Sequence, residues 1–216
     1  MKSNKSRQNF FLKKNNYENL NPLIIVCMLV VFMTTSQNNL ILRYELFGML
    51  FVSILGGLLH FTFELSGFNP IVGTFSAVNE SVWEHLKLGF WPILLLTIIE
   101  YRFIIKQTNN FFLGKLVSAF TIILVIPAIF YSYTSITGES IFLIDILSFF
   151  VSVIIGQILS YKILTYKQFP EYLKWISLVT LAILAILFIV FTFYPPNLPP
   201  FQDPVSGGYG IINQPH

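Results

Sequence analysis

Charged residues are scarce in this sequence. Asp, Glu, Lys and Arg make up 11% of its 216 residues, against roughly 25% in an ordinary soluble domain. Hydrophobic residues make up 55%, and 23 residues are Phe, so the chain cannot hide its apolar surface from water. This composition excludes a soluble globular protein. The one cysteine, Cys27, lies in an apolar run, which excludes an internal disulfide and a cysteine-based metal site.

The basic residues form no continuous stripe. The formal net charge is +3, but Lys and Arg are dispersed at the ends of apolar segments. This distribution is typical of membrane orientation and not of a nucleic-acid surface. We therefore expect the lipid bilayer to be the partner, with no nucleic acid bound.

Long apolar runs fill most of the chain. A helix needs about 20 apolar residues to cross a hydrocarbon core of about 30 Å, and a lone strand would leave its backbone groups unpaired in lipid. The sequence therefore predicts an all-α, polytopic transmembrane helical bundle with five clear spans. These are residues 44–65, 88–105, 112–133, 141–164 and 173–194. A further run, 22–35, is short, and the sequence leaves open whether it is a sixth span or lies in the interface.

The polar ends of the chain frame this helical region. Residues 1–20 are predicted to be a disordered basic tail in the cytoplasm, residues 21–194 a single transmembrane helical domain, and residues 195–216 a segment rich in Pro and Gly. Basic residues in short loops are retained in the cytoplasm, which places loop 66–87 and the C-terminal segment on the outer face. That segment either folds back over this face, with Asp203 contributing a carboxylate, or is disordered.

Polar functional groups are densest between residues 60 and 87. His60 and Glu64 are four residues apart and so share one helical face. Glu80, Glu84 and Lys87 have the spacing i, i+4, i+7 of one face of a following helix. Both halves of the segment are therefore predicted to present carboxylate and imidazole groups at the same membrane surface.

Three further residues are predicted to belong to this cluster or to support it. Asn79 is expected to cap the helix that follows it, and His85 lies on a stripe beside the carboxylates. Asp145 lies about one turn into its span from the outer end, where it can approach the cluster, reach the interface or pair with Lys87. By contrast, Glu100 lies near basic residues at the cytoplasmic end, and we interpret it as part of a satisfied surface pair.

Ionisable groups at a membrane surface are costly and so mark a candidate site. His60, Glu64 and His85 are predicted ligands for a divalent metal such as zinc, and Glu80 or Glu84 is the predicted general base of a catalytic site. Two other interpretations stay open. The cluster is either a structural network of ion pairs and hydrogen bonds, or part of a substrate or ion pathway.

Several segments resemble a family of small bacterial membrane proteins classed as a domain of unknown function. The resemblance covers residues 44–212, and its most specific part is NESVWEHLK. Other parts are LLHFTFELSG, GQILSYKIL and FTFYPPNLPPFQDPVSGGYGI. It implies a multi-pass protein of the bacterial inner membrane and brings no known activity, substrate or cofactor.

Two hypotheses of function remain. The first is a metal-dependent membrane hydrolase that acts on lipid or envelope substrates at the outer face. The second is a non-catalytic membrane protein, such as a small transporter or an assembly factor, in which the cluster is structural. A transporter needs polar residues deep in several spans, and the sequence indicates few besides Asp145 and Gln157.

Overall fold

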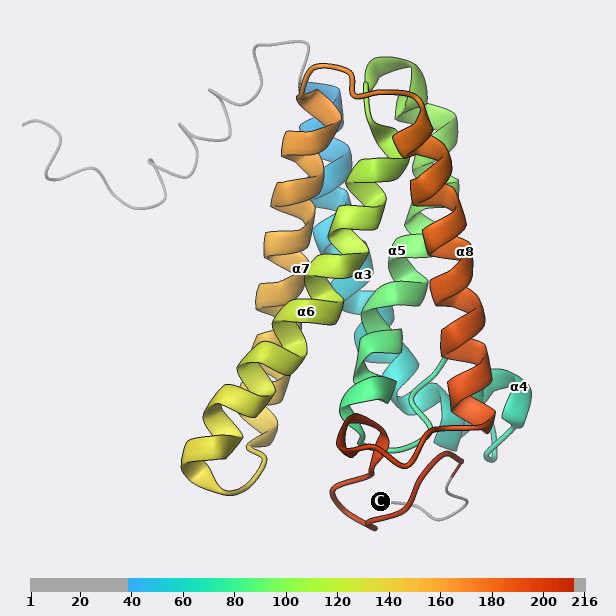
Figure 1. Cartoon of the computed structure of the whole chain (residues 1–216), viewed down its shortest axis with the longest axis vertical. Coiled ribbons are helices and arrows are strands. Elements are labelled where there is room, and N and C mark those ends of the chain that lie inside the picture. The colour runs from blue at the N-terminus through green and yellow to red at the C-terminus, as the bar shows by residue number, and fades with distance from the viewer. Residues whose placement is uncertain (1–38, 212–216) are drawn as a thin grey trace, which may run out of the picture. The chain divides into compact units, whose positions relative to one another are not determined.

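The computed structural model describes residues 39–211, and the candidate run 22–35 and the basic tail lie outside this range. Five long helices make up the described chain, without any β-strand (Figure 1). They are α3 (Asn39–Leu65), α5 (Val82–Ile104), α6 (Phe111–Thr137), α7 (Phe142–Thr165) and α8 (Tyr172–Phe193). Three short elements complete it: α4 (Pro70–Gly73), η1 (Ile105–Gln107) and η2 (Pro199–Phe201). The predicted all-α fold is confirmed.

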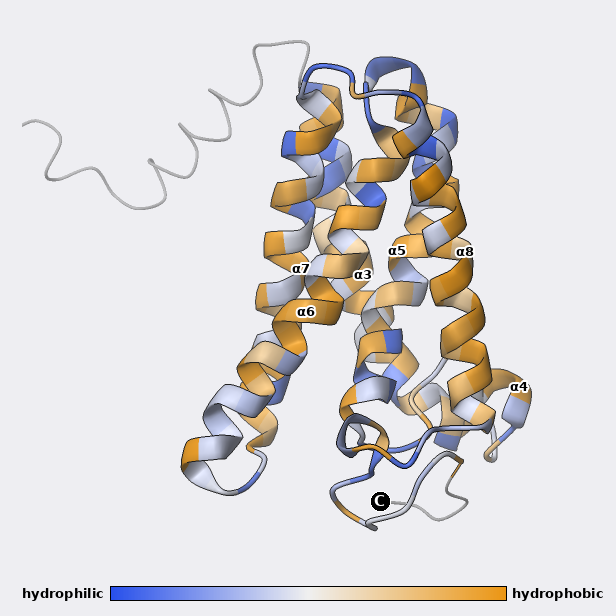
Figure 2. Cartoon of the chain, viewed as in Figure 1, coloured by the Kyte–Doolittle hydropathy of each residue, from blue (hydrophilic) through white to orange (hydrophobic). Residues whose placement is uncertain are grey.

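All five long helices are long and apolar enough to cross a membrane. The shortest, α8, has 22 residues, which at 1.5 Å per residue spans about 33 Å. Hydrophobic residues dominate the middle of the helices, whereas hydrophilic residues gather toward their ends and in the connections (Figure 2). The five predicted spans are thus confirmed, with ends that differ by a few residues.

Alternating helix directions give the bundle two distinct ends. We call one the loop end, formed by residues 66–81, the α6–α7 turn 138–141 and the C-terminal segment 194–211. We call the other the basic end, formed by residues 105–110 and 166–171. Most exposed Lys and Arg residues of the described chain lie at or near the basic end. Which end faces the cytoplasm stays a prediction.

Small residues let the helices approach closely. A Cβ atom on Gly89 of α5 would lie 2.7 Å from a methyl carbon of Ile122 on α6, closer than two carbon atoms can pack. A Cβ on Gly56 of α3 would lie 2.5 Å from the carbonyl oxygen of Leu88. This is the carbonyl that Pro92, which has no N–H, leaves without its helical donor. Because residue 56 is Gly, α3 can pack closely against the turn of α5 that lacks this hydrogen bond.

The start of α5 differs from the sequence-based expectation. Ser81, and not Asn79, is the N-cap, because the Ser81 side chain accepts a hydrogen bond from the Glu84 N–H. The Asn79 side-chain oxygen Oδ1 instead accepts from the Ser81 N–H and stabilises the turn before the helix. The helix runs without a break from Val82 to Ile104, with Pro92 in its interior.

The C-terminal segment lies against the start of α5 at the loop end (Figure 1). Phe201 is buried and packs on Trp83, with ring centroids 4.7 Å apart. Trp83 also packs on Phe188 of α8 at 4.7 Å, so it is part of an aromatic core. This packing brings residues about 120 positions apart into one local structure.

Candidate functional site

Glu80 lies in the loop immediately before α5, so its predicted helical face with Glu84 and Lys87 is wrong. The C-terminal segment fixes its backbone. The Glu80 N–H donates to Asp203 Oδ1 at 3.2 Å, and the side-chain amide of the preceding Asn79 donates to the Gly210 carbonyl at 2.8 Å. These two contacts fix the backbone of the loop against the C-terminal segment. The Glu80 carboxylate is then directed toward the bundle.

Two histidines from different helices meet this carboxylate. His60 projects from the last turns of α3, and its Nε2 lies 3.6 Å from Glu80 Oε2. His85 projects from the first turn of α5, and its Nε2 lies 3.4 Å from the same oxygen. One ligand atom from each of the three residues lies within 4.8 Å of the others. We call these three residues the His–Glu–His triad.

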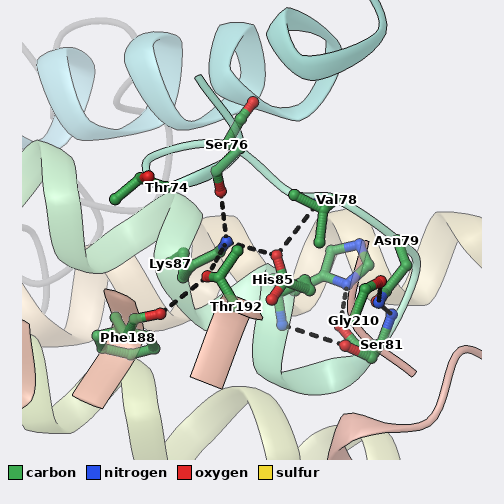
Figure 3. Close-up of polar contacts among 12 residues, drawn as sticks. Thr74, Ser76, Val78, Asn79, Ser81, His85, Lys87, Phe188, Thr192 and Gly210 are labelled. Carbon is green, nitrogen blue, oxygen red and sulfur yellow. Dashed lines mark hydrogen bonds and ion pairs between the residues drawn. The ribbon is translucent and has the colours of Figure 1, made fainter. Parts of the chain in front are cut away.

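The orientation of His85 defines the chemistry of its ring. Its Nδ1 lies 2.9 Å from the Ser81 carbonyl oxygen, visible beside Ser81 in Figure 3. A carbonyl oxygen can only accept, so Nδ1 carries the hydrogen. In the neutral ring, Nε2 then presents a lone pair to a carboxylate oxygen. That contact is repulsive unless a proton or a metal ion lies between the two atoms.

Charge around Glu80 favours its ionised form. Burial raises the pKa of the Glu80 carboxyl, but the interactions with His60 and His85 outweigh burial and hold this pKa well below its usual value. An ionised carboxylate can act as a metal ligand, whereas each imidazole must lose its second proton before its Nε2 can bind a metal ion.

The spacing of the His–Glu–His triad suits a tetrahedral metal ion. Zinc binds imidazole nitrogen and carboxylate oxygen at about 2.0–2.2 Å, so neighbouring ligands of a tetrahedral site lie about 3.4 Å apart. The two nitrogen–oxygen distances of 3.4 and 3.6 Å match this value. Three protein ligands leave a fourth position for water, as in catalytic sites. Glu80 therefore occupies the ligand position that the sequence interpretation gave to Glu64.

A cavity of about 310 Å³ opens beside the triad. Asp145 of α7 lines it together with His60, Glu80 and His85. The Tyr133 hydroxyl of α6 donates to Asp145 Oδ1 at 2.6 Å and so fixes the carboxylate at the cavity wall. The remaining walls are largely apolar, formed by side chains that include Ile126, Phe130, Phe142 and Phe149. The prediction that Asp145 approaches the cluster agrees with this position.

A second cavity, of about 250 Å³, is also lined by His60, Glu80, His85 and Asp145 and continues between α3 and α7. Gly56 and Gly57 line it on α3, and Phe149 and Phe150 on α7. The exposed surface beside it includes Phe61, which is 59% exposed, and Phe142, which is 69% exposed. The groove therefore leads from the triad to an exposed apolar surface between α3 and α7.

Glu84 does not reach the triad. It is buried, its carboxylate lies 2.5 Å from the Lys87 ammonium, and it accepts from the Val78 N–H at 3.0 Å. Lys87 in turn donates to the Gly73 carbonyl at 2.9 Å and to the Thr192 hydroxyl at 2.8 Å. Figure 3 shows the Thr192 hydroxyl beside the Lys87 ammonium. The pair ties α4, α5 and α8 together and leaves Glu84 no face toward the cavity.

The other predicted site residues lie around the triad. Glu64 lines a small cavity of about 170 Å³ beside His60 and Glu80 but is not in the group of candidate ligands. Asp203 faces the backbone of its own segment as well as Glu80, accepting from the Ser206 N–H at 2.9 Å and from the Ser206 hydroxyl. Asp203 and Asn79 therefore hold the loop of Glu80 and do not face the cavity.

A second charged cluster lies near the basic end, and sequence reasoning missed it. Glu100, interpreted as a surface residue, is fully buried, and its carboxylate lies 2.5 Å from the Lys115 ammonium. Lys115 also pairs with Glu45 of α3 at 2.7 Å. The available signal was an acid inside an apolar run, in RYELFGMLF. We call Glu45, Lys115 and Glu100 the Glu–Lys–Glu cluster.

The fold and the site first indicate the class of protein, and a comparison of sequences then gives the family. Five apolar helices indicate a multi-pass membrane protein, with a His/Glu cluster at one end of its bundle. The model of a family of unknown function, DUF6512, matches residues 33–211, and the chain belongs to that family. No curated protein and no solved structure matches the chain.

Proposed function

We propose that the protein is a membrane-embedded metal-dependent hydrolase whose metal ion is held by His60, Glu80 and His85. The observation that carries the proposal is the convergence of two imidazole Nε2 atoms on one carboxylate oxygen, at 3.4 and 3.6 Å, at the wall of a cavity. Two histidines and one glutamate are a donor set of catalytic zinc, and they leave a position for water.

Asp145 supports the chemistry. A metal-bound water loses its proton more easily than free water, and Asp145, which lines the same cavity, is the proposed base that accepts this proton. The resulting hydroxide attacks the carbonyl or phosphoryl centre of an ester. The ester bond breaks, the leaving alcohol takes up the proton, and one water is consumed for each acid and alcohol formed.

The apolar groove between α3 and α7 supports a lipid substrate. An ester at the triad can extend an acyl chain between Gly57 and Phe150 while its polar part stays at the loop end. If the basic end is cytoplasmic, as the distribution of Lys and Arg predicts, the substrate belongs to the outer leaflet or the cell envelope. The proposed location is accordingly the bacterial cell membrane.

Metal content tests the proposal directly. The full chain is purified in mild detergent with an affinity tag that contains no histidine, incubated with zinc, washed and measured by plasma mass spectrometry. We expect about one equivalent of metal in the parent and none in His60→Ala, Glu80→Gln or His85→Ala. His216→Ala, the third histidine of the chain, is the matched control and retains the metal.

Hydrolysis of lipid esters by the loaded protein then separates a catalytic site from a structural one. Asp145→Asn is expected to keep the metal and lose the activity. A parent that binds no metal while folding normally would overturn the proposal. The triad would then be an ion pair that ties α3 to α5, as in a non-catalytic membrane protein.

A further inference from the structure

The Glu–Lys–Glu cluster lies inside the bundle, toward the end opposite the triad. Glu45 of α3 is 1% exposed, and Glu100 of α5 and Lys115 of α6 are each 0% exposed. Each lies four to six residues from the basic end of its helix, which corresponds to a depth of about 6–9 Å along the helix axis.

The Lys115 ammonium bridges the two carboxylates. It lies 2.7 Å from Glu45 Oε1 and 2.5 Å from Glu100 Oε2. Ser160 of α7 donates its hydroxyl hydrogen to the same Glu45 oxygen at 3.1 Å. Four helices, α3, α5, α6 and α7, therefore contribute to one buried polar network.

Counting charge shows that this network is incomplete. Two ionised carboxylates and one ammonium carry a net charge of −1, and an unpaired charge inside a membrane protein costs several kcal/mol. Two carboxylate oxygens of the cluster, Glu45 Oε2 and Glu100 Oε1, also lack a hydrogen-bond donor. One added proton would supply both the missing positive charge and a missing hydrogen-bond donor to carboxylate oxygen.

We propose that the Glu–Lys–Glu cluster binds one exchangeable proton, taken up from the aqueous phase at the basic end. A proton on one carboxylate neutralises the cluster and converts a buried acceptor into a donor. A metal ion fits less well, because the Lys115 ammonium already occupies the space between the carboxylates and repels a second cation. A proton needs no coordination shell.

The affinity of the cluster for this proton depends mainly on its own three charged groups. On α3, α5 and α6, the charged groups that face one another inside the bundle are Glu45, Glu100 and Lys115. From α7 the facing groups are the neutral Ser160 and Gln157. The other basic side chains on these four helices near the basic end are exposed to solvent. They are Arg43, Arg102 and Lys162.

Infrared spectroscopy of the reconstituted full-length protein tests the proposal. The parent is titrated between about pH 5 and pH 9, a range in which exposed Glu is already ionised. We expect the carbonyl band of about one protonated carboxylic acid to persist into this range and then disappear as pH rises. Glu100→Gln or Glu45→Gln should remove it, whereas Glu139→Gln, a substitution in the exposed α6–α7 turn, should leave it unchanged.

The two glutamine variants remain informative about folding. Each removes the excess negative charge, so each should unfold at a temperature no lower than the parent. A parent spectrum with no protonated carboxylic acid above the pH at which exposed carboxylates ionise would overturn the proposal. So would a band that both glutamine variants retain, or a titration that shifts when sodium replaces choline at constant ionic strength, which would indicate a metal cation instead.

Discussion

Each end of the bundle carries a cluster of three ionisable residues, but the two clusters differ in composition and in burial. At the loop end, two imidazoles and one carboxylate, of His60, His85 and Glu80, are about a quarter exposed and line a cavity. Near the basic end, two carboxylates and one ammonium are fully enclosed by four helices. The difference in burial decides what each can bind. An open cluster can bind a metal ion with its water and a substrate, whereas a closed one has room for a proton.

Glu80 and Glu84 are only four residues apart in sequence, yet they show the same contrast between an open and a closed environment. Glu80, in a loop held by the C-terminal segment, faces the cavity, whereas Glu84, in the first turn of α5, is neutralised by Lys87 inside the protein. A carboxylate near a membrane surface is therefore a candidate ligand only when nothing inside the protein neutralises it. Four sets of variants sharpen this contrast, from the largest expected effect to the smallest.

Removing the ammonium of the buried cluster should have the largest effect. Lys115→Met leaves two carboxylates facing each other without compensation, and we expect it to lower the free energy of unfolding by about 5 kcal/mol. For a chain of this size, that corresponds to a fall in Tm of about 10 °C or more, measured by tryptophan fluorescence in mild detergent. The triple variant E45Q/K115M/E100Q should recover most of the loss, and the exposed substitution Lys162→Met should cause none. An unchanged Tm for Lys115→Met would contradict the burial of this charge.

Neutralising Glu84 and Glu80 in turn should separate stability from metal binding. Glu84→Gln leaves the buried Lys87 ammonium unpaired and should destabilise the protein by about 3 kcal/mol while keeping its metal. Glu80→Gln breaks only partly exposed contacts, so it should cost about 1 kcal/mol or less and abolish metal binding. Thermal unfolding and metal content of both variants decide the point. Equal loss of metal in both would show that the two carboxylates act as one group.

Asp203 tests whether the C-terminal segment positions the triad. Asp203→Ala removes the acceptor for the Glu80 and Ser206 N–H groups and should cost about 1–2 kcal/mol. It should also weaken metal binding by roughly tenfold or more, because Glu80 is no longer held. Asp203→Asn keeps an acceptor oxygen and should lie between Ala and the parent. Isothermal titration with zinc measures the three affinities, and identical values would remove this role of the segment.

Filling the groove between α3 and α7 should have the smallest effect on stability. No atom lies within 4 Å of a Cβ built on Gly57, so Gly57→Phe should change the free energy of unfolding by no more than about 0.5 kcal/mol. Metal content should also be unchanged. Hydrolysis of long-chain esters should fall relative to short-chain ones, because the new ring occupies space proposed for an acyl chain. A constant ratio between the two substrates would argue against the groove as the acyl site.

Apolar runs were sufficient to predict the five spans, since hydrocarbon thickness determines the length of each helix. The local geometry near residue 80 was harder to predict. Asn79 and Ser81 are both good N-cap residues, and the choice between them depends on contacts with Gly210 and Asp203, more than 120 positions away. The predicted approach of His60, His85 and Asp145 needed only that their helix ends meet at one surface.

The buried cluster could not be predicted in the same way. Glu100 has basic neighbours in sequence, which favoured a surface pair, but it points inward to Lys115 of the next helix. Glu45 and Lys115 are 70 positions apart, and no spacing rule relates them. Only the general rule that an acid within an apolar run is costly identifies such residues. It identifies the acid but not its partner.

The hydrogen bonds from Asn79 to Gly210 and from Glu80 to Asp203 also set an order of events during synthesis. His60, Glu80 and His85 enter the membrane with the first helices of the bundle, whereas residues 203–210 are translated only after α8. The Glu80 loop therefore waits for more than 100 further residues before its final contacts form. If the triad binds a metal ion as proposed, loading is a late step in biogenesis, and a ribosome-bound intermediate that already contains all three triad residues should not yet hold the ion firmly.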